Sequence, residues 1–469
     1  MSNDTIETDR IQKPSKLAIK FANIVFVLGI LFLTFIIIYL LYSIYRNEKD
    51  YYIYYIFIGL IIITIFCFGL KLSGNKKIVL SNYILASFIS IYSYEIYLNF
   101  TFNLRVLEGD PTKRAAKLNG INWDKRTMLE VVDSLRNYIE IDAVPVLGGQ
   151  EFINTNGLKT KIGSIFPLSG ISNKPTVYWN ITGFFPPTII TDEYGYNNSK
   201  GLYIKNDVDI ITLGSCLVEA ASDHPYKGDI AYLLRERGFK AINLGKGGSD
   251  ALLSLAQIKE YAEVLKPKVV LWFVNYTDIP GDESLQSPLL QRYLNDDSFT
   301  QNLFYRQSDI DSTLTNYIDH KLSKMHEGKD DNESKLIDSY RLIDNLKLGK
   351  IRSIFFSTII KNSQNKHYTL VLSKAKQIVN NWGGKLYVVY HPHINRYQSE
   401  ESRITYNNYR KNILKIATNL DIPFIDLYED AFVHHPDPLS LFPYRVDGHY
   451  TKDANVLMTE AIINKLKEN

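Results

Sequence analysis

The chain has 469 residues, which is enough for a membrane segment together with one large or two ordinary domains. Its formal net charge is +3, and the basic residues are scattered rather than gathered into a stripe, which excludes the pattern of a nucleic-acid-binding protein. Of the two cysteines, Cys67 lies in an apolar run and Cys216 lies far along the chain in a polar region. We therefore expect no disulfide between them.

Three apolar runs open the chain, over residues 21–45, 51–70 and 79–100. The first two carry no charge, and each approaches the ~20 residues that span a bilayer core. The third carries Glu95 near its end. Residues 21–100 are therefore predicted to form three transmembrane helices after a cytoplasmic N-terminus, residues 1–20. A plain anchor is favoured over a pore or a lipid-binding groove, because Glu95 is the only acidic or basic side chain in these runs.

The distribution of charge predicts the orientation of this segment. Four basic residues precede the first run and three lie between the second and the third, whereas the two between the first and the second are offset by two acidic residues. The positive-inside rule places the N-terminus and the second loop in the cytoplasm. Three crossings would then place the rest of the chain outside. We expect a multi-pass protein of an inner or plasma membrane whose soluble part is extracytoplasmic.

The soluble part divides into a lead-in region, residues 101–205, and an α/β region, residues 206–469. A helix is predicted near residues 125–138, and residues 171–198 are rich in aromatic residues, Pro, Gly and Asn, which favours hairpins and loops. From residue 208 onward, short apolar runs alternate with stretches of helical spacing. Such alternation is typical of a doubly wound parallel sheet.

The α/β region yields five strands and five helices. The predicted strands are 208–213, 240–243, 268–274, 385–390 and 423–427, and the predicted helices are 229–237, 251–265, 370–382, 405–419 and 452–467. A polar, charge-rich and largely helical insert, about residues 285–368, interrupts the alternation. It is interpreted equally well as a lid or docking element and as a solvated decoration.

Side chains suited to catalysis follow the predicted strands, and active sites of open parallel sheets form outside the carboxyl ends of the strands. Ser215 and Cys216, both capable of nucleophilic attack, follow the first strand. The second strand leads into a glycine-rich turn, residues 243–250, which can direct backbone N–H groups at an oxyanion. A polar cluster, residues 275–278, follows the third strand.

A fourth group precedes the last predicted helix, where Asp447 and His449 lie two residues apart. A histidine in this position can act as a general base, and a carboxylate beside it can hold the required tautomer.

These four blocks resemble, in kind and in order, those of the SGNH/GDSL hydrolases, a family mainly of esterases and acyl-transferring enzymes. The stretches TDEYGYNN and NLGKGGSDALLSLAQIKEYAEVLKPKVVLWF also look like membrane-anchored members encoded beside polysaccharide genes. The resemblance implies a three-layer, flavodoxin-like α/β domain with a parallel sheet. It further implies an ester-bearing glycan or lipid-linked sugar outside the cytoplasm as substrate, with neither a metal nor an organic cofactor.

In the first two blocks, the resemblance places Cys216 on the family's nucleophilic serine. A shift of register by one residue would give that role to Ser215 instead. Gly248 matches the glycine whose backbone N–H group stabilises the oxyanion.

The last two blocks depart from the family pattern. Thr277 stands in the place of the family's oxyanion asparagine, and Asn275 lies two residues earlier. His449 matches the family's base, and Asp447 would orient it from two residues away instead of the usual three. These departures keep a rival hypothesis open, in which the domain is a catalytically degenerate glycan-binding or assembly protein.

The other candidate side chains are interpreted as structural rather than functional. His391 and His393 follow a predicted strand and are interpreted as two surface histidines rather than as metal ligands, because no third ligand is near in the sequence. The aromatic residues Trp179, Phe184 and Phe185 could line a sugar or acyl groove, although hairpin or core packing is the commoner fate of such side chains.

Overall fold

The computed structural model describes residues 14–47, 52–107, 110–155, 157–160, 163–180, 183, 185, 188–219, 228–275, 287–327, 348–355 and 357–468. The chain forms two compact units. The first comprises residues 1–107 with 333–363, and the second comprises residues 108–332 with 364–469.

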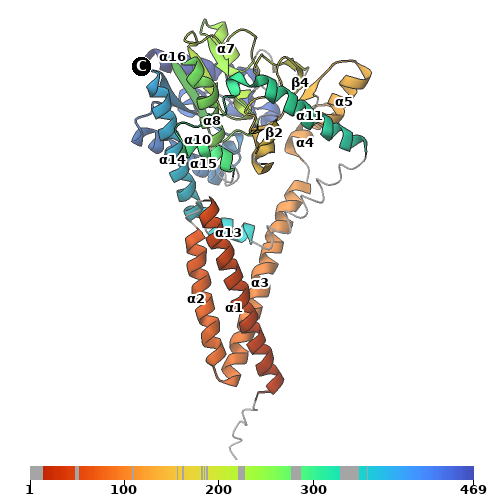
Figure 1. Cartoon of the computed structure of the whole chain (residues 1–469), viewed down its shortest axis with the longest axis vertical. Coiled ribbons are helices and arrows are strands. Elements are labelled where there is room, and N and C mark those ends of the chain that lie inside the picture. The colour runs from red at the N-terminus through yellow and green to blue at the C-terminus, as the bar shows by residue number, and fades with distance from the viewer. Residues whose placement is uncertain are drawn as a thin grey trace, which may run out of the picture. The chain divides into compact units, whose positions relative to one another are not determined.

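The first unit contains the long N-terminal helices α1 (Lys16–Asn47), α2 (Tyr52–Lys71) and α3 (Gly74–Leu107), together with the short helix α13 (Gly349–Phe355) (Figure 1). α1 and α2 are long and apolar enough to cross a membrane. Only 11% and 17% of their most apolar stretches are buried within the protein. Side chains of this kind facing outward suit hydrocarbon rather than water.

The third predicted span is helical within α3, but it does not reach the apolarity of the other two. Among the described residues, two helices and not three meet the length and composition of a membrane span. Ser, Asn and Tyr side chains interrupt the apolar residues of α3, which also carries Glu95. The prediction of three apolar spanning helices is therefore wrong in number.

Glu95 has a structural partner within the first unit. Its buried carboxylate accepts hydrogen bonds from the backbone N–H groups of Lys350 and Ile351, both at 2.9 Å. These N–H groups belong to the first turn of α13, which has no intrahelical acceptors for them, and a carboxylate there also complements the helix dipole. Glu95 thus caps a helix that is 255 residues away in the sequence.

A five-stranded parallel sheet forms the centre of the second unit. Its strands are β6 (Ile210–Leu213), β7 (Ala241–Asn243), β8 (Val269–Val274), β9 (Lys385–Tyr390) and β10 (Phe424–Asp426). The spatial order is β10-β9-β8-β6-β7, and every neighbouring pair is parallel. This is the flavodoxin-like 2-1-3-4-5 arrangement, whose switch point lies between β6 and β8. The predicted α/β fold with a parallel sheet is confirmed.

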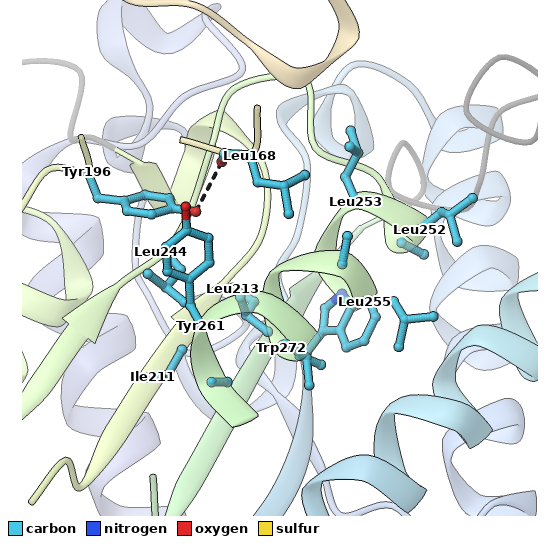
Figure 2. Packing of buried hydrophobic residues seen from close by; sticks show 14 of the residues in the cluster. Leu168, Tyr196, Ile211, Leu213, Leu244, Leu252, Leu253, Leu255, Tyr261 and Trp272 are labelled. Carbon is cyan, nitrogen blue, oxygen red and sulfur yellow. Dashed lines mark hydrogen bonds between the residues drawn. The ribbon is translucent and has the colours of Figure 1, made fainter. Parts of the chain in front are cut away.

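Both faces of the sheet are covered by helices. The residues of β6 and β8 alternate between two buried clusters, so that Ile211 and Trp272 lie in one and Ile210 and Leu271 in the other. The first cluster includes side chains of α8 (Ala251–Gln257), α14 (Ser357–Asn381) and α15 (Glu400–Asn419), and the second includes α7 (Ile230–Glu236) and α16 (Lys452–Glu468). Figure 2 shows Leu255 near Trp272 and, elsewhere in the first cluster, Tyr261 near Tyr196, whose ring centroid lies 5.3 Å from its own.

The helix predicted over residues 251–265 contains a π-helical turn. α8 continues into η2 (Ile258–Ala262) and then into α9 (Glu263–Leu265). Glu260 in this turn is buried, and its carboxylate accepts hydrogen bonds from Tyr293 Oη, Thr300 Oγ1 and the backbone N–H groups of Gln301 and Leu303. These four bonds tie the helix to the insert.

The described first part of the insert belongs to the core of the second unit. It contains α10 (Pro288–Asn295) and α11 (Gln307–His326), whose residues Tyr293, Ile310 and Leu314 are fully buried. A fully buried aliphatic or aromatic side chain typically stabilises a fold by about 1.5–3 kcal/mol. The interpretation as a solvated decoration is therefore wrong for residues 287–327.

The lead-in region folds with the α/β region in the second unit. Its helices are α4 (Pro111–Leu118) and α5 (Met128–Tyr138), and the latter lies within the predicted helix and begins with a Thr127–Glu130 capping box. Its strands are β1 (Val144–Pro145), β2 (Leu158–Thr160), β3 (Gly163–Ile165), β4 (Pro175–Val177) and β5 (Ile189–Ile190). The other short elements are α6 (Cys216–Glu219), η1 (Gly149–Thr155), η4 (Leu303–Tyr305), η5 (Ile394–Tyr397), η6 (Tyr428–Phe432), η7 (Pro438–Leu441) and η8 (Pro443–Arg445).

Candidate active site

The turn after β6 presents Cys216 at the switch point of the sheet. Gly214 makes this turn possible, because a methyl group in place of its hydrogen would lie 2.7 Å from Val218 Cγ2 and 3.2 Å from Phe273 Cβ of β8. The carbonyl of Ser215 then accepts hydrogen bonds from the N–H groups of Val218 and Glu219, at 3.0 and 3.2 Å, which opens α6. Cys216 is half-buried in the first turn of this short helix.

His449 lies in a row between Asp447 and Cys216 and interacts with both. Its Nδ1 lies 2.7 Å from Asp447 Oδ1, and its backbone N–H group donates to the same oxygen at 2.8 Å. The Cys216 thiol lies close enough to the imidazole for the interaction between them to raise the pKa of His449. No side-chain hydrogen bond joins Ser215 to His449 among the described residues. The spacing of two residues is sufficient because the chain turns tightly enough for one carboxylate oxygen to meet both N–H groups.

The electrostatics of this row favour charged partners. Burial lowers the pKa of His449, but hydrogen bonds to Asp447 and Cys216, together with their negative charges, outweigh burial and raise that pKa to about 10. Burial raises the pKa of Asp447, but the hydrogen bonds and charge of His449 outweigh it and leave the pKa lowered. At neutral pH the row therefore holds an ionised carboxylate next to an imidazolium. An imidazolium beside a thiol stabilises the thiolate, which is the nucleophilic form of cysteine.

Thr112 of α4 completes the surroundings of Asp447. Its hydroxyl donates to Asp447 Oδ2 at 3.1 Å, so that each carboxylate oxygen is engaged. Thr112 is buried and is 335 residues from Asp447 in the sequence. Nothing in its sequence surroundings indicates this contact.

The glycine-rich turn after β7 lies directly beside Cys216. A methyl group on Gly247 would lie 3.8 Å from Cys216 Cβ and 3.5 Å from Trp179 Nε1. The next residue, Gly248, is half-buried, and its backbone N–H group meets no acceptor among the described residues. This N–H group is therefore available to a ligand.

A buried ion pair shapes the same turn. Lys246 Nζ lies 2.8 Å from Glu219 Oε1, and both side chains are almost fully buried. Glu219 Oε2 accepts the backbone N–H group of Gly247 at 2.7 Å. Removing either charge would leave the other buried without a partner, which costs several kcal/mol. The pair thus holds the turn against α6, and neither residue was identified from the sequence, although Glu219 is three residues from Cys216.

Asn275, at the end of β8, is buried, and its Nδ2 lies 3.5 Å from His391 Nε2. His391 Nδ1 in turn lies 3.1 Å from the hydroxyl of Tyr450, the residue after His449. The candidate Thr277 lies outside the described residues. Asn275 is thus connected to the loop of His449 through His391.

The interpretation of His391 and His393 as surface residues is wrong. His391 is buried, and burial together with the nearby charge of His393 lowers its pKa to about 3. His393 is half-buried, and burial and the charge of His449 lower its pKa to about 4. A methyl group on Gly448 would lie 3.2 Å from His393 Nε2. Both histidines are therefore neutral neighbours of the loop that carries His449.

The three predicted aromatic residues have different surroundings. Trp179 is 40% exposed and lies beside the glycine-rich turn. Phe185 packs against the main core cluster, and Phe184 lies outside the described residues. Of the three, only Trp179 is shown next to the site.

Comparisons with known proteins give the following findings. The sequence matches no protein-family model and none of the curated proteins with which it was compared. Similar solved structures include a lipase/acylhydrolase from Enterococcus faecalis, with 12% identity, coverage of 56% of this chain and 96% of that chain, and a TM-score of 0.32. A catalytic mutant of an acetylxylan esterase from Geobacillus stearothermophilus has 12% identity, the same coverages and a TM-score of 0.31. A GDSL-like lipase from Bacteroides thetaiotaomicron has 10% identity, coverages of 57% and 92%, and a TM-score of 0.32. A likeness at these scores carries no argument about function, which must be derived from the site itself.

Proposed function

We propose that the chain is a membrane-anchored acyl hydrolase or acyl transferase that uses Cys216 as its nucleophile. The observation that carries the proposal is the row Cys216–His449–Asp447, in which His449 is hydrogen-bonded to the orienting carboxylate of Asp447 and interacts with the nucleophile Cys216 on its other side. This arrangement is the general signature of an activated nucleophile. The anchor would be the pair α1 and α2.

In the first step, the Cys216 thiolate attacks the carbonyl carbon of an ester, and a carbon–sulfur bond forms while the carbonyl oxygen becomes an oxyanion. The carbon–oxygen bond to the alcohol then breaks, and the alcohol leaves with the proton that His449 supplies. Because the raised pKa of His449 keeps its ring protonated at neutral pH, His449 acts here as a general acid. The product is a thioester on Cys216.

In the second step, neutral His449 takes a proton from water or from an acceptor hydroxyl, and the resulting oxygen nucleophile attacks the thioester. The carbon–sulfur bond breaks, and Cys216 leaves as a thiolate beside the reprotonated His449. Asp447 stays ionised throughout and stabilises each imidazolium, as its lowered pKa allows. Attack by water gives hydrolysis, and attack by a sugar hydroxyl gives transfer.

The oxyanion is proposed to bind the backbone N–H group of Gly248, with Asn275 or Thr277 as a second donor. Gly248 lies in the turn that passes beside Cys216, and its N–H group meets no acceptor among the described residues. The Glu219–Lys246 pair would keep this turn in place. Donors that are held in advance at the developing charge are typically the largest contribution to such catalysis.

The substrate is proposed to be an O-acyl group on a glycan or lipid-linked sugar. The exposed indole of Trp179 beside the nucleophile suits the apolar face of a sugar ring. An extracytoplasmic substrate requires α3 to cross the membrane, since two crossings would return the chain to the side of its N-terminus. Because α3 does not reach the apolarity of α1 and α2, a reporter fusion is needed to assign the side of the membrane on which the domain lies. An alkaline phosphatase fusion after Asn469 that is inactive, while a β-galactosidase fusion at the same position is active, would place the domain inside.

Hydrolysis of 4-nitrophenyl acetate by the full chain in detergent tests the nucleophile. Cys216→Ala should abolish turnover, whereas Cys67→Ala, the matched control at the other cysteine, should retain it. Mass spectrometry should find an acyl group on Cys216 that neutral hydroxylamine removes. Loss of activity in Ser215→Ala but not in Cys216→Ala would shift the register by one residue. If neither substitution reduces activity or acylation in a folded protein, the site is not catalytic and the glycan-binding hypothesis gains support.

A further inference from the structure

An open groove of about 830 Å³ lies in the second unit, outside the row of catalytic candidates. It is lined mainly by α4 and by the segment that follows it, residues 121–127, with Asn180 on one side. Four of its lining side chains are basic, namely Lys113, Lys117, Lys125 and Arg126, and two are acidic. A groove of this size can accommodate a ligand of several atoms' width, and its charge favours anions.

The two acidic side chains do not cancel this charge. Asp124 is paired with Arg126, whose Nε and Nη2 atoms lie 3.1 and 2.7 Å from its carboxylate. Asp110 is the N-cap of α4 and accepts the backbone N–H group of Thr112 at 2.9 Å. The three lysines form no ion pair with any described residue. They therefore remain available to a negatively charged ligand.

An aromatic platform adjoins these ammonium groups. Trp123 lines the groove, and Lys113 Nζ lies 5.6 Å from the centre of its ring system. The C–H groups of a sugar ring pack well on the face of an indole, and a neighbouring ammonium can meet an acidic substituent of the same ring. A ligand with both a sugar face and an anionic group would satisfy both features at once.

Two chain neighbours connect the groove to the candidate active site. Thr112, which precedes Lys113, donates its hydroxyl to Asp447. Trp179, which precedes Asn180, lies beside Gly247 and Cys216. Consecutive Cα atoms are only about 3.8 Å apart, so the rim of the groove lies one residue from contacts with the site at two places.

We propose that this groove binds an anionic saccharide, with the sugar ring on Trp123 and a carboxylate or phosphate on Lys117 and Lys125. Resting on the proposed function, this inference narrows the substrate to an acidic O-acylated glycan whose neighbouring residue occupies the groove while the ester reaches Cys216. The same chemistry would admit a uronic acid polymer or a polymer of phosphate-linked sugars, and binding experiments distinguish the two.

Binding should be measured by calorimetry on the full-length Cys216→Ala variant in detergent, so that no turnover interferes. The probes are an oligogalacturonate, an oligomer of phosphate-linked hexoses and a neutral xylo-oligosaccharide of similar length. At least one anionic probe should bind more tightly than the neutral one, with an affinity that falls as salt is added. The combined substitutions Lys117→Glu and Lys125→Glu should weaken that binding about tenfold or more, since each removes an attraction and adds a repulsion.

A matched charge reversal provides the control. Lys411→Glu with Lys415→Glu, on the exposed face of α15, changes the net charge equally and should leave binding unchanged. Equal binding of all three probes, or an equal loss in the control pair, would overturn the inference. Because binding is read without turnover, saccharide binding in a chain that never hydrolyses an ester would refute the proposed function alone. Ester hydrolysis without selective binding would refute only the proposal that the groove binds an anionic saccharide.

Discussion

Replacing Cys216 by Ser should change the pH dependence of ester hydrolysis rather than abolish it. In the wild-type site, the interaction with Cys216 raises the pKa of His449, and this contribution adds to that of Asp447. A serine hydroxyl is neutral, so it provides no charge. The pKa of His449 should therefore fall in the variant, since burial, which lowers it, is unchanged.

The size of the effect follows from how far the pKa of His449 is raised above its ordinary value. Its pKa of about 10 lies well above the ordinary histidine value of 6.5. At 1.36 kcal/mol for each pKa unit, the partners of the ring together favour its charged form by roughly 5 kcal/mol net of burial. The wild-type enzyme needs the imidazolium beside the thiolate, so its activity should decline as the pH rises through about 10. The serine variant needs a neutral imidazole as base, so its activity should rise with pH and persist where that of the wild type declines.

The assay is the rate of 4-nitrophenyl acetate hydrolysis between pH 5 and pH 11, corrected for spontaneous hydrolysis and fitted to the apparent pKa values of the pair. His449→Ala should damage the serine variant more than the wild type, because a thiolate partly forms without a base whereas a serine hydroxyl does not. Identical alkaline limbs in the wild type and in Cys216→Ser would refute the reasoning, since they would show that the thiol does not influence His449.

Further predictions concern the partners of the site and the core. Asp447→Asn should lower kcat by roughly 100- to 10,000-fold, by analogy with other orienting carboxylates, while circular dichroism shows an unchanged fold. Glu260→Ala should destabilise the second unit by roughly 3 kcal/mol or more in urea unfolding, because four donors lose their acceptor, whereas the exposed Glu263→Ala should change stability little. Since the folded pKa of His391 is about 3, below its unfolded value of 6.5, its contribution should leave stability unaffected above pH 6.5 and lower it by about 2 kcal/mol at pH 5. Replacing His391 by Gln should remove that acid sensitivity, and an unaltered pH dependence of unfolding would contradict its burial as a neutral ring.

The amino-acid sequence by itself determined the strands and helices of the α/β region, because their signals are local. After its first residue, the run KVVLWFV is entirely apolar, as is typical of a strand that is buried on both faces of a sheet. It forms β8. Asp229 and Asp250 cap α7 and α8 by accepting backbone N–H groups within the first turn, as short polar side chains do at helix starts. The order of nucleophile, glycine-rich turn and final histidine is equally visible, since each follows or precedes one of these elements.

The prediction failed where a property depends on more than a local run. The length of the apolar runs alone predicted three membrane spans. The polar side chains of α3, however, leave it less apolar than α1 and α2. The sequence around Glu95 indicated an isolated charge, yet its partners are the first N–H groups of α13, which come from a segment 255 residues later. A short sequence window contains no information about such a partner.

Only the tertiary structure decided which side chains surround the candidate nucleophile. Thr112 reaches Asp447 because α4 of the lead-in packs against the loop before the last helix. Lys246 and Glu219 are paired because the turn after β7 lies on α6, and His391 is neutral because β9 ends inside the protein. Burial and pairing of charges depend on which segments exclude water from a group, and those segments are distant in the sequence. The residues that can perform the chemistry are therefore visible in the sequence, while their charge states are set by the packing of the whole second unit.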